Sequence, residues 1–280
     1  MSDGTLTPEA LAARAVAAGV DLWALTDHDE LGGQARAAQA AAALGLDYLC
    51  GVEISVSFLH QTVHIVGLGV NADDAQLRQG LKCTSGGRDG RAQQMAAQLL
   101  AVGIPGCYEG ALRYAGNPNL IARTHFARFL VERGVCRDTS EVFRHYLTDG
   151  KPGFVPHNWA TLRDAVRWIR AADGVAVLAH PARYRLTANE QYALFGEFKE
   201  HGGLGVEVVT GSHTSAEAHS TADLAREFGL AASRGSDFHS PDEGRVDLGA
   251  LPTLPSDLTP VWELLDTRIR RAPRRATLAA

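Results

Sequence analysis

Short apolar runs alternate with helical segments along most of this 280-residue chain, and polar residues follow several of those runs directly. Runs of this length bounded by turns predict buried strands, whereas the alanine-rich and amphipathic stretches between them predict helices. Strands are expected at 20–25, 46–50, 62–66, 175–178, 205–209 and 230–233, with helices at 8–18, up to 44, and at 161–172, 188–201 and 215–228. This alternation predicts an α/β fold with a mostly parallel sheet, either doubly wound or closed into a barrel.

The middle of the chain differs because helical patterns dominate it. Helices are expected at 91–102, 124–133 and 140–147, and another near the end of the chain at 261–269. We therefore predict a discontinuous main domain, residues 1–86 and 151–280, that carries a helical insertion over residues 87–150.

Composition excludes several classes of protein. The net charge of −5 and the isoelectric point near 6.1 give no global basic field of the kind that binds nucleic acid non-specifically. The four cysteines are scattered without CxxC spacing, which argues against a disulfide scaffold. No apolar run approaches the roughly 18 residues that span a bilayer, and the first residues lack a secretion pattern. We expect a soluble cytoplasmic protein that does not bind membranes.

Potential metal ligands gather at the ends of the predicted strands. Carboxylates and neutral imidazoles are the side chains that hold catalytic divalent metals. The carboxyl ends of strands form the functional face of parallel α/β folds and barrels, so we expect these side chains to converge. The candidates are His28 within Thr26-Asp27-His28-Asp29, Glu53 after Gly51-Val52, His64 inside an apolar run, His180 before Pro181, and Asp237 and His239 around Phe238.

Each candidate also has a purely structural explanation. An Asp-His-Asp turn commonly caps a loop, Glu53 fits a surface position after a strand, and His64 fits a core histidine. His180 fits a turn that ends a strand. The Asp237–His239 segment is harder to explain in this way, because an extended segment projects its first and third side chains to the same side. The structural explanation needs several independent coincidences, whereas a metal cluster needs one cause.

Six segments resemble successive motifs of the PHP (polymerase and histidinol phosphatase) superfamily, in the family's order. They are Ser2–Gly4, Leu25–Asp29, Gly51–Ser55, Val63–Gly67, Ala179–Pro181 and Gly235–His239. Two more, Arg123–Arg128 and Lys151–Val155, resemble the branch of 3′,5′-nucleoside bisphosphate phosphatases, whose members can also act as 5′-to-3′ exonucleases on short RNA. The resemblance implies a distorted (β/α)7 barrel with a helical insertion. It also implies two or three divalent metals per chain, manganese first, with iron or zinc as the alternatives.

The resemblance further implies a role for each ligand. Glu53 would bridge two metals, His64 and His180 would complete the shell of the second, and Asp237 would serve the first. The third metal would be held by Asp3, His28 and His239. A metal-bound hydroxide would be the nucleophile, because paired metals lower the pKa of water. No side chain is therefore assigned to attack phosphorus.

Arginines are the expected partners of the substrate's phosphate, because the planar guanidinium pairs with phosphate through two parallel hydrogen bonds. Arg88, Arg91 and Arg123 lie in or beside the predicted insertion. Arg88 and Arg91 could equally form a solvated helix face. Arg123 is favoured because His125 lies two residues further on and the resembling branch uses this segment at the substrate; His125 is therefore a fourth candidate, and His157 a weaker one.

One family motif has no counterpart in this sequence. The family begins with a strand that ends in His-x-His, a few residues before the segment corresponding to Ser2–Gly4, whereas this sequence begins at Met1. The first metal would then keep only Glu53 and Asp237, which should weaken that site. We expect from this that the natural start lies upstream and that the 280-residue form is impaired. An intact mass of the native protein equal to 29.9 kDa would contradict this expectation.

Three functions stay open at this point. The first is removal of the 3′-phosphate from nucleoside 3′,5′-bisphosphates, and the second is 5′–3′ exoribonuclease action on short RNA. The third, of another class, is a catalytically impaired module that binds phosphorylated ligands. The expected partner is a small nucleotide or short RNA, with no obligate protein partner. A dinucleotide-dependent dehydrogenase is poorly supported, because Gly67-Leu68-Gly69 lacks the later helix-opening glycine.

Overall fold

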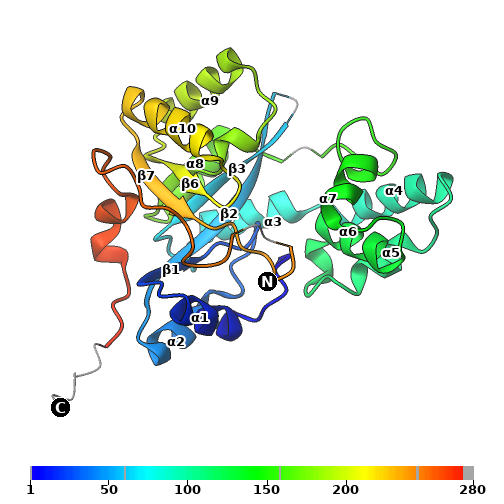
Figure 1. Cartoon of the computed structure of the whole chain (residues 1–280), viewed down its shortest axis with the longest axis horizontal. Helices are drawn as coiled ribbons and strands as arrows, with labels where there is room; N and C mark the ends of the chain where they lie inside the picture. Colours follow the sequence, from blue (N-terminus) through cyan, green and yellow to red (C-terminus); the bar gives the residue numbers. More distant parts are fainter. Residues whose placement is uncertain (1, 60, 158, 244–245, 274–280) are drawn as a thin grey trace. The chain divides into compact units, whose positions relative to one another are not determined.

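The computed structural model describes residues 2–59, 61–157, 159–243 and 246–273, and the chain divides into two compact units (Figure 1). The sheet unit comprises residues 4–81 and 159–280, and the helical unit comprises residues 1–3 and 82–158. The boundaries predicted for the insertion, 87 and 150, fall inside the helical unit. The division into a discontinuous main domain of residues 1–86 and 151–280 and an insertion of residues 87–150 stays a prediction.

The sheet unit is built on a mixed, seven-stranded sheet. Its strands run in the order β1-β2-β3-β5-β6-β7, with β4 paired to β2. Their bounds are β1 (Leu22–Leu25), β2 (Asp47–Phe58), β3 (Gln61–Leu68), β4 (Ala160–Thr161), β5 (Val175–Leu178), β6 (Gly205–Thr210) and β7 (Ala231–Gly235). The predicted α/β class is confirmed.

The sheet is mostly parallel, as expected, and β3 is the exception. β1 is parallel to β2, and β6 is parallel to both β5 and β7, but β3 is antiparallel to β2 and to β5. The cause is the length of a connection: β2 ends at Phe58 and β3 begins at Gln61, and only antiparallel strands accept so short a link.

β2 also runs well past its predicted end at residue 50. Buried Val52, Ile54 and Val56 alternate with more polar residues and continue the ladder with β3. Glu53 therefore lies within a strand rather than after one.

Helices of the sheet unit begin and end where the sequence provides caps. The hydroxyls of Thr7, Thr161, Thr187 and Thr214 each accept a hydrogen bond from a backbone N–H in the first helical turn. The left-handed Gly45 ends α2. The helices are α1 (Pro8–Ala17), α2 (Gln34–Leu44), α3 (Ala75–Ser85, its last residues in the helical unit), α8 (Leu162–Ala171), α9 (Ala188–Glu200) and α10 (Ser215–Glu227), with 3-10 helices η3 (Pro181–Arg183) and η4 (Val261–Arg268).

The two faces of the sheet are covered differently because side chains alternate along each strand. Helices α1, α2, α8, α9 and α10 contribute to the core on the outer face, which takes Ile54 and Ile65 from the sheet. The inner face carries the alternate residues, and η4 packs there against Val66 and Leu68 of β3. His64 lies two residues before Val66 on the same strand, so its side chain also points inward. It lies outside the part of β3 that η4 covers.

The helical unit has its own core. Met95 and Leu99 pack with Phe126 and Leu130, which explains why the apolar periodicity of this region is helical. Its elements are α4 (Arg88–Ala101), α5 (Cys107–Leu112), η1 (Pro118–Leu120), α6 (Arg123–Glu132), α7 (Thr139–Val142) and the π-helical turn η2 (Phe143–Leu147). Throughout the described residues, no helix combines the length and apolar character needed to cross a membrane.

Candidate metal centre

Glu53 lies at the centre of a cluster of imidazoles in the sheet unit. Its Oε1 is 2.8 Å from Nδ1 of His64 and 3.2 Å from Nε2 of His180. Its Oε2 is 3.8 Å from Nδ1 of His28. Glu53 is 5% exposed and His180 is 2% exposed, so a carboxylate and three imidazoles converge in a place with little access to water.

The sheet explains why three of these side chains meet. In the β2–β3 ladder, His64 pairs with Ser55 and Glu53 pairs with Val66, which puts Glu53 and His64 on the same inner face. The segment before α2 continues beside β2, since Asp29 N–H donates to the Glu53 carbonyl and Glu53 N–H donates to the Asp27 carbonyl. His28 is thereby held against Glu53.

Asp29 has a structural role in this segment. Its carboxylate accepts hydrogen bonds from the N–H and the hydroxyl of Ser55, at 2.9 and 3.0 Å. Its φ of 52° is left-handed, which these two bonds help to maintain. The capping explanation for the Asp-His-Asp turn is thus correct for Asp29.

His180 and Asp237 occupy strained turns after β5 and β7. Both have left-handed φ, 27° and 54°, a region that non-glycine residues avoid unless their surroundings enforce it. His180 N–H donates to Oε2 of Glu207 at 2.9 Å. Asp237 accepts a hydrogen bond from Arg183 at 2.5 Å, and the His239 ring Nδ1 lies 2.9 Å from the Asp237 carbonyl oxygen.

Protonation states in the cluster suit metal binding. Burial lowers the pKa of His64 to about 4 despite the nearby Glu53, so the imidazole is neutral at pH 7. Burial alone would raise the pKa of Glu53, but His28, His64 and the hydrogen bonds from His180 and His64 outweigh it and hold that pKa well below its usual value. A neutral imidazole and an ionised carboxylate are the forms that bind metals.

The donor set also fits a divalent ion. Ligand atoms of His28, Glu53 and His64 lie within 4.8 Å of one another. Nδ1 of His180 is buried and makes no hydrogen bond to any described residue, and buried polar atoms in folded proteins rarely lack a partner. Mixed imidazole and carboxylate ligands suit manganese, iron or zinc.

The remaining predicted residues belong to the helical unit. Asp3 accepts a hydrogen bond from the Thr124 hydroxyl at 3.0 Å. His125 is completely buried; its Nδ1 accepts from Ala122 N–H at 3.0 Å, and its Nε2 has no partner among the described residues. Burial lowers the pKa of His125 to about 4, so this imidazole is neutral and its Nε2 is a donor.

Arginines gather in the same unit. Burial, followed by the charges of Arg123 and Arg88, lowers the pKa of Arg91 to about 9. Arg91 donates to the Val155 carbonyl at 2.9 Å and Arg123 to the Leu147 carbonyl at 3.3 Å, so backbone oxygens orient both guanidinium groups. His157 lies beside Gly87 at the start of α4. Like charges brought together in this way favour an anionic ligand.

Comparison with known proteins agrees with the geometry of the sheet unit. The PHP domain family model matches residues 1–79. A 3′,5′-nucleoside bisphosphate phosphatase from Chromobacterium violaceum is 51% identical over 270 residues, which cover 96% of this chain and 95% of that protein. This chain belongs to the PHP family.

Two more similar proteins extend the comparison. The 5′-3′ exoribonuclease Rnm of Escherichia coli is 41% identical over 265 residues, covering 94% of this chain and 90% of that protein. A solved amidohydrolase structure from Chromobacterium violaceum, with bound sulfate and no metal, superposes with a TM-score of 0.95 at 50% identity, covering 98% of this chain and 95% of that one. The family resemblance read from the six motifs is confirmed.

Sequence reasoning missed three residues around this PHP cluster. The Tyr184 hydroxyl accepts from His64 N–H at 2.8 Å and donates to the Ala179 carbonyl at 3.0 Å, which ties β3 to the end of β5. Arg183 pairs with Asp237. Burial, together with Glu53 and Asp237, raises the pKa of Glu207 to about 8. A carboxylate inside the apolar strand β6 was a signal that could have identified Glu207.

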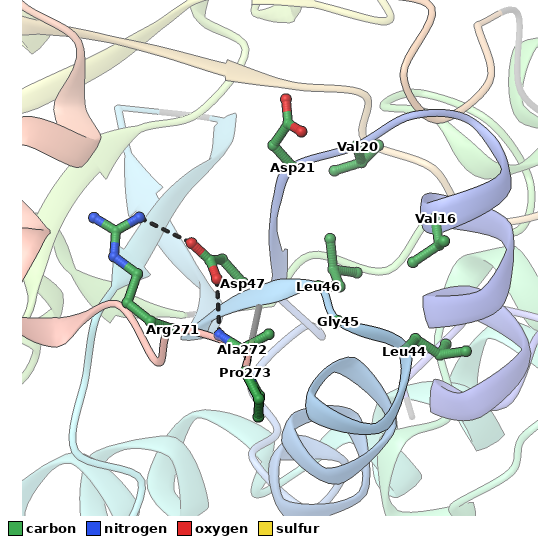
Figure 2. Close-up of a pocket in the computed structure, with 10 residues that line it drawn as sticks. All are labelled: Val16, Val20, Asp21, Leu44, Gly45, Leu46, Asp47, Arg271, Ala272 and Pro273. Atoms are coloured by element: carbon green, nitrogen blue, oxygen red, sulfur yellow. Dashed lines mark hydrogen bonds and ion pairs between the residues drawn. The ribbon is translucent and has the colours of Figure 1, made fainter. Parts of the chain in front are cut away.

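A separate pocket of about 840 Å³ in the sheet unit offers different chemistry (Figure 2). Val16, Val20, Leu44 and Leu46 supply apolar lining beside Arg271. Two carboxylates, Asp21 and Asp47, also line it, and Asp47 accepts hydrogen bonds from the Arg271 guanidinium and from Ala272 N–H, each at 2.8 Å. Its lining residues include no histidine or cysteine, so the metal cluster remains the stronger candidate for catalysis.

Proposed function

We propose that this protein is a metal-dependent phosphomonoesterase that removes the 3′-phosphate from nucleoside 3′,5′-bisphosphates and leaves a 5′-nucleotide. The observation that carries the proposal is the buried Glu53 carboxylate within hydrogen-bonding distance of His64 and His180. The activity named for the Chromobacterium violaceum relative at 51% identity supplies the substrate class. The Glu53 cluster and the activity named for the relative both indicate an enzyme of the phosphoric ester hydrolase class.

We propose the ligand set in the form that the sequence resemblance implied. Glu53, His64 and His180 would hold one metal, with Glu53 shared and Asp237 serving a second; Asp3, His28 and His239 would hold a third. Manganese is the first choice, with iron or zinc as alternatives, because the donors mix carboxylate and imidazole. Such ions would lower the pKa of water and neutralise charge on the phosphoryl group.

The chain's own residues would perform the remaining tasks. Glu53 provides negative charge in a place that burial shields from solvent, and neutral His64 leaves a nitrogen lone pair for an ion. Arg88, Arg91, Arg123 and His125 would bind phosphate of the substrate. The sulfate in the solved relative supports an anion site in this family, because sulfate has the shape and charge of a phosphate group.

The second candidate function is 5′–3′ exoribonuclease activity, which the Escherichia coli relative at 41% identity favours by its name. The same centre could cleave a phosphodiester, because both reactions are attack of water on phosphorus.

We also infer a cytoplasmic location, since all four cysteines are free thiols, as in reducing compartments.

Product analysis tests the two candidates directly. The protein would be incubated with manganese and either adenosine 3′,5′-bisphosphate or a short 5′-phosphorylated RNA, and products would be separated by chromatography. The phosphatase proposal expects adenosine 5′-monophosphate and orthophosphate as the faster reaction. Mononucleotides released from the RNA 5′ end at a much higher rate would favour the exoribonuclease instead. Adenosine 3′-monophosphate as the product would contradict the assigned position of cleavage.

A further inference from the structure

Glu207 lies between two turns that carry proposed metal ligands. It is on β6, whose neighbours in the sheet are β5 and β7. His180 follows β5, and Asp237 follows β7 after Gly235. Side chains alternate along β6, and this alternation places Glu207 on the inner face of the sheet, where Glu53 and His64 meet. A central strand is therefore placed to contact both turns through one side chain.

The contact with the His180 turn is a hydrogen bond. Oε2 of Glu207 accepts the His180 N–H at 2.9 Å. The backbone at this point has φ 27° and ψ 56°, a conformation that is strained for a residue other than glycine. A fixed acceptor for the N–H offsets part of that strain, so Glu207 helps to determine the conformation from which the imidazole projects.

The contact with the Gly235 turn is close packing. A Cβ added at Gly235 would lie 2.7 Å from Oε1 of Glu207, nearer than real side chains approach. Gly235 has no left-handed φ that would itself require glycine. The absence of a side chain there leaves room for the Glu207 carboxylate, two residues before Asp237.

The strand is also irregular at this residue. The β6–β7 ladder changes register between Glu207 and Val209, and bulges next to functional sites re-aim side chains. Glu207 is 9% exposed. A carboxylate buried this deeply destabilises a fold unless it gains compensating interactions, and the hydrogen bond from His180 N–H is one of them.

We propose that Glu207 is a positioning residue that fixes the His180 and Gly235–Asp237 turns so that their side chains present themselves to a divalent metal. The inference rests on the proposed metal centre, and it assigns Glu207 a part in metal affinity without assigning it a place among the ligands. Residues around metal ligands commonly change metal affinity by about 10- to 100-fold when they are replaced.

The test is calorimetric titration of the metal-free protein with manganese, for the natural sequence and for Glu207→Leu, Glu207→Gln and Gly235→Ala. Glu207→Leu removes the acceptor and should weaken manganese binding by about 10- to 100-fold. Glu207→Gln keeps an acceptor oxygen for His180 N–H and should restore most of the affinity. Gly235→Ala keeps the carboxylate but inserts a methyl group against it, and should also weaken binding.

Gly205→Ala is the matched control, because it perturbs β6 where the added Cβ would meet Val177 and Val261 at 3.1 and 3.2 Å, on the part of the inner face that η4 covers. Its manganese affinity should equal that of the natural protein. Thermal unfolding of each metal-free variant shows whether it folds, and Gly235→Ala keeps the test decisive if Glu207→Leu does not fold. Unchanged affinity in a folded Glu207→Leu or Gly235→Ala variant overturns the positioning role alone, whereas no manganese binding by the natural protein overturns the metal centre as well.

Discussion

Glu53 is the central residue of the candidate metal centre in the sheet unit. Three imidazoles surround it, from the segment before α2, from β3 and from the turn after β5. Together they hold its pKa well below the usual value, although burial opposes ionisation. An ionised, desolvated carboxylate beside the neutral imidazole of His64 attracts a divalent cation more strongly than an exposed carboxylate does.

Replacing Glu53 by glutamine tests this attraction. The amide keeps the shape of the side chain but has no charge, so manganese affinity should fall by about 100-fold or more, as measured by calorimetric titration of the metal-free protein. Glu200→Gln, at the exposed end of α9, is the matched control and should bind manganese normally. Equal affinities in the two variants would contradict the assignment of Glu53 as a ligand.

His125 gives the helical unit a pH dependence of its own. Burial lowers its pKa to about 4 from an ordinary value of 6.5, so the unfolded chain takes up a proton at a higher pH than the folded chain does. Stability from this residue is therefore present above pH 6.5 and is lost as the pH falls toward 4. The loss between about pH 7 and pH 5 should be about 2 kcal/mol.

His125→Asn isolates the effect. The asparagine oxygen can accept the Ala122 N–H as Nδ1 does, but the side chain does not titrate. Denaturant unfolding of the metal-free proteins at both pH values should show the natural protein losing about 2 kcal/mol more than the variant. If the free energy of unfolding of the two proteins changed equally with pH, the pKa of His125 would not be lowered in the folded state.

Much of the cluster could be predicted at the residue scale. Strand ends and the motif order singled out His28, Glu53, His64 and His180, because ligand types are recognisable in the sequence without knowing their contacts. A carboxylate within an apolar strand could have drawn attention to Glu207, but the roles of Glu207 and Tyr184 could not be predicted, since they depend on which backbone groups lie next to them after folding. That information exists only in the pairing of strands.

At the scale of elements, the space around two helical glycines shows how closely the neighbouring helices pack. Gly80 in α3 faces α8, and a Cβ there would lie 2.3 Å from Cδ2 of Trp168. A Cβ added at Gly196, in the middle of α9, would have a single described residue within 4 Å, Phe228 at 3.9 Å. Helix propensity favours alanine over glycine at both positions, but only Gly196 has room for it.

These two positions should respond to alanine with opposite signs. Gly80→Ala should lower the free energy of unfolding by about 2 kcal/mol through overpacking. Gly196→Ala should raise it by about 0.5–1 kcal/mol through propensity alone. Chemical denaturation measures both. A stabilising Gly80→Ala would mean that α3 and α8 are not packed as closely as the glycine contacts indicate.

Element types followed from sequence pattern more readily than element pairing did. Threonine caps and Gly45 marked helix ends because capping is a local interaction. The full length of β2 and the antiparallel direction of β3 depend on a partner strand, and α5 was missed because its six residues (Cys107–Leu112) are too few to establish a helical period. The predicted helix at 140–147 divides into α7 and a π-helical turn, a distinction that apolar spacing does not encode.

At the scale of the whole molecule, the chain distributes two kinds of chemistry over two units. Most of the proposed metal ligands lie in the sheet unit, whereas Arg88, Arg91 and Arg123 belong to the helical unit, where burial and the charges of Arg123 and Arg88 lower the pKa of Arg91. We propose that the sheet unit supplies all the metal ligands except Asp3 and that the helical unit supplies the phosphate-binding residues. Mutations in the two units should then change different kinetic parameters.

Arg91→Gln tests this division of roles. Loss of a buried guanidinium should raise KM for adenosine 3′,5′-bisphosphate by about tenfold or more and leave manganese affinity unchanged. Arg113→Gln, an exposed arginine of the same unit that pairs with Glu132, should leave both parameters unchanged. An Arg91→Gln variant with normal KM would remove Arg91 from the proposed phosphate site.

Orthophosphate release from adenosine 3′,5′-bisphosphate tests the central claim most directly. The assay would compare the 280-residue protein with manganese, with manganese and excess chelator, and after Glu53→Gln. The account predicts orthophosphate release that requires manganese, and almost none in the other two conditions. Absence of release with manganese, or release that neither chelator nor Glu53→Gln reduces, would contradict a metal-dependent phosphatase centred on Glu53.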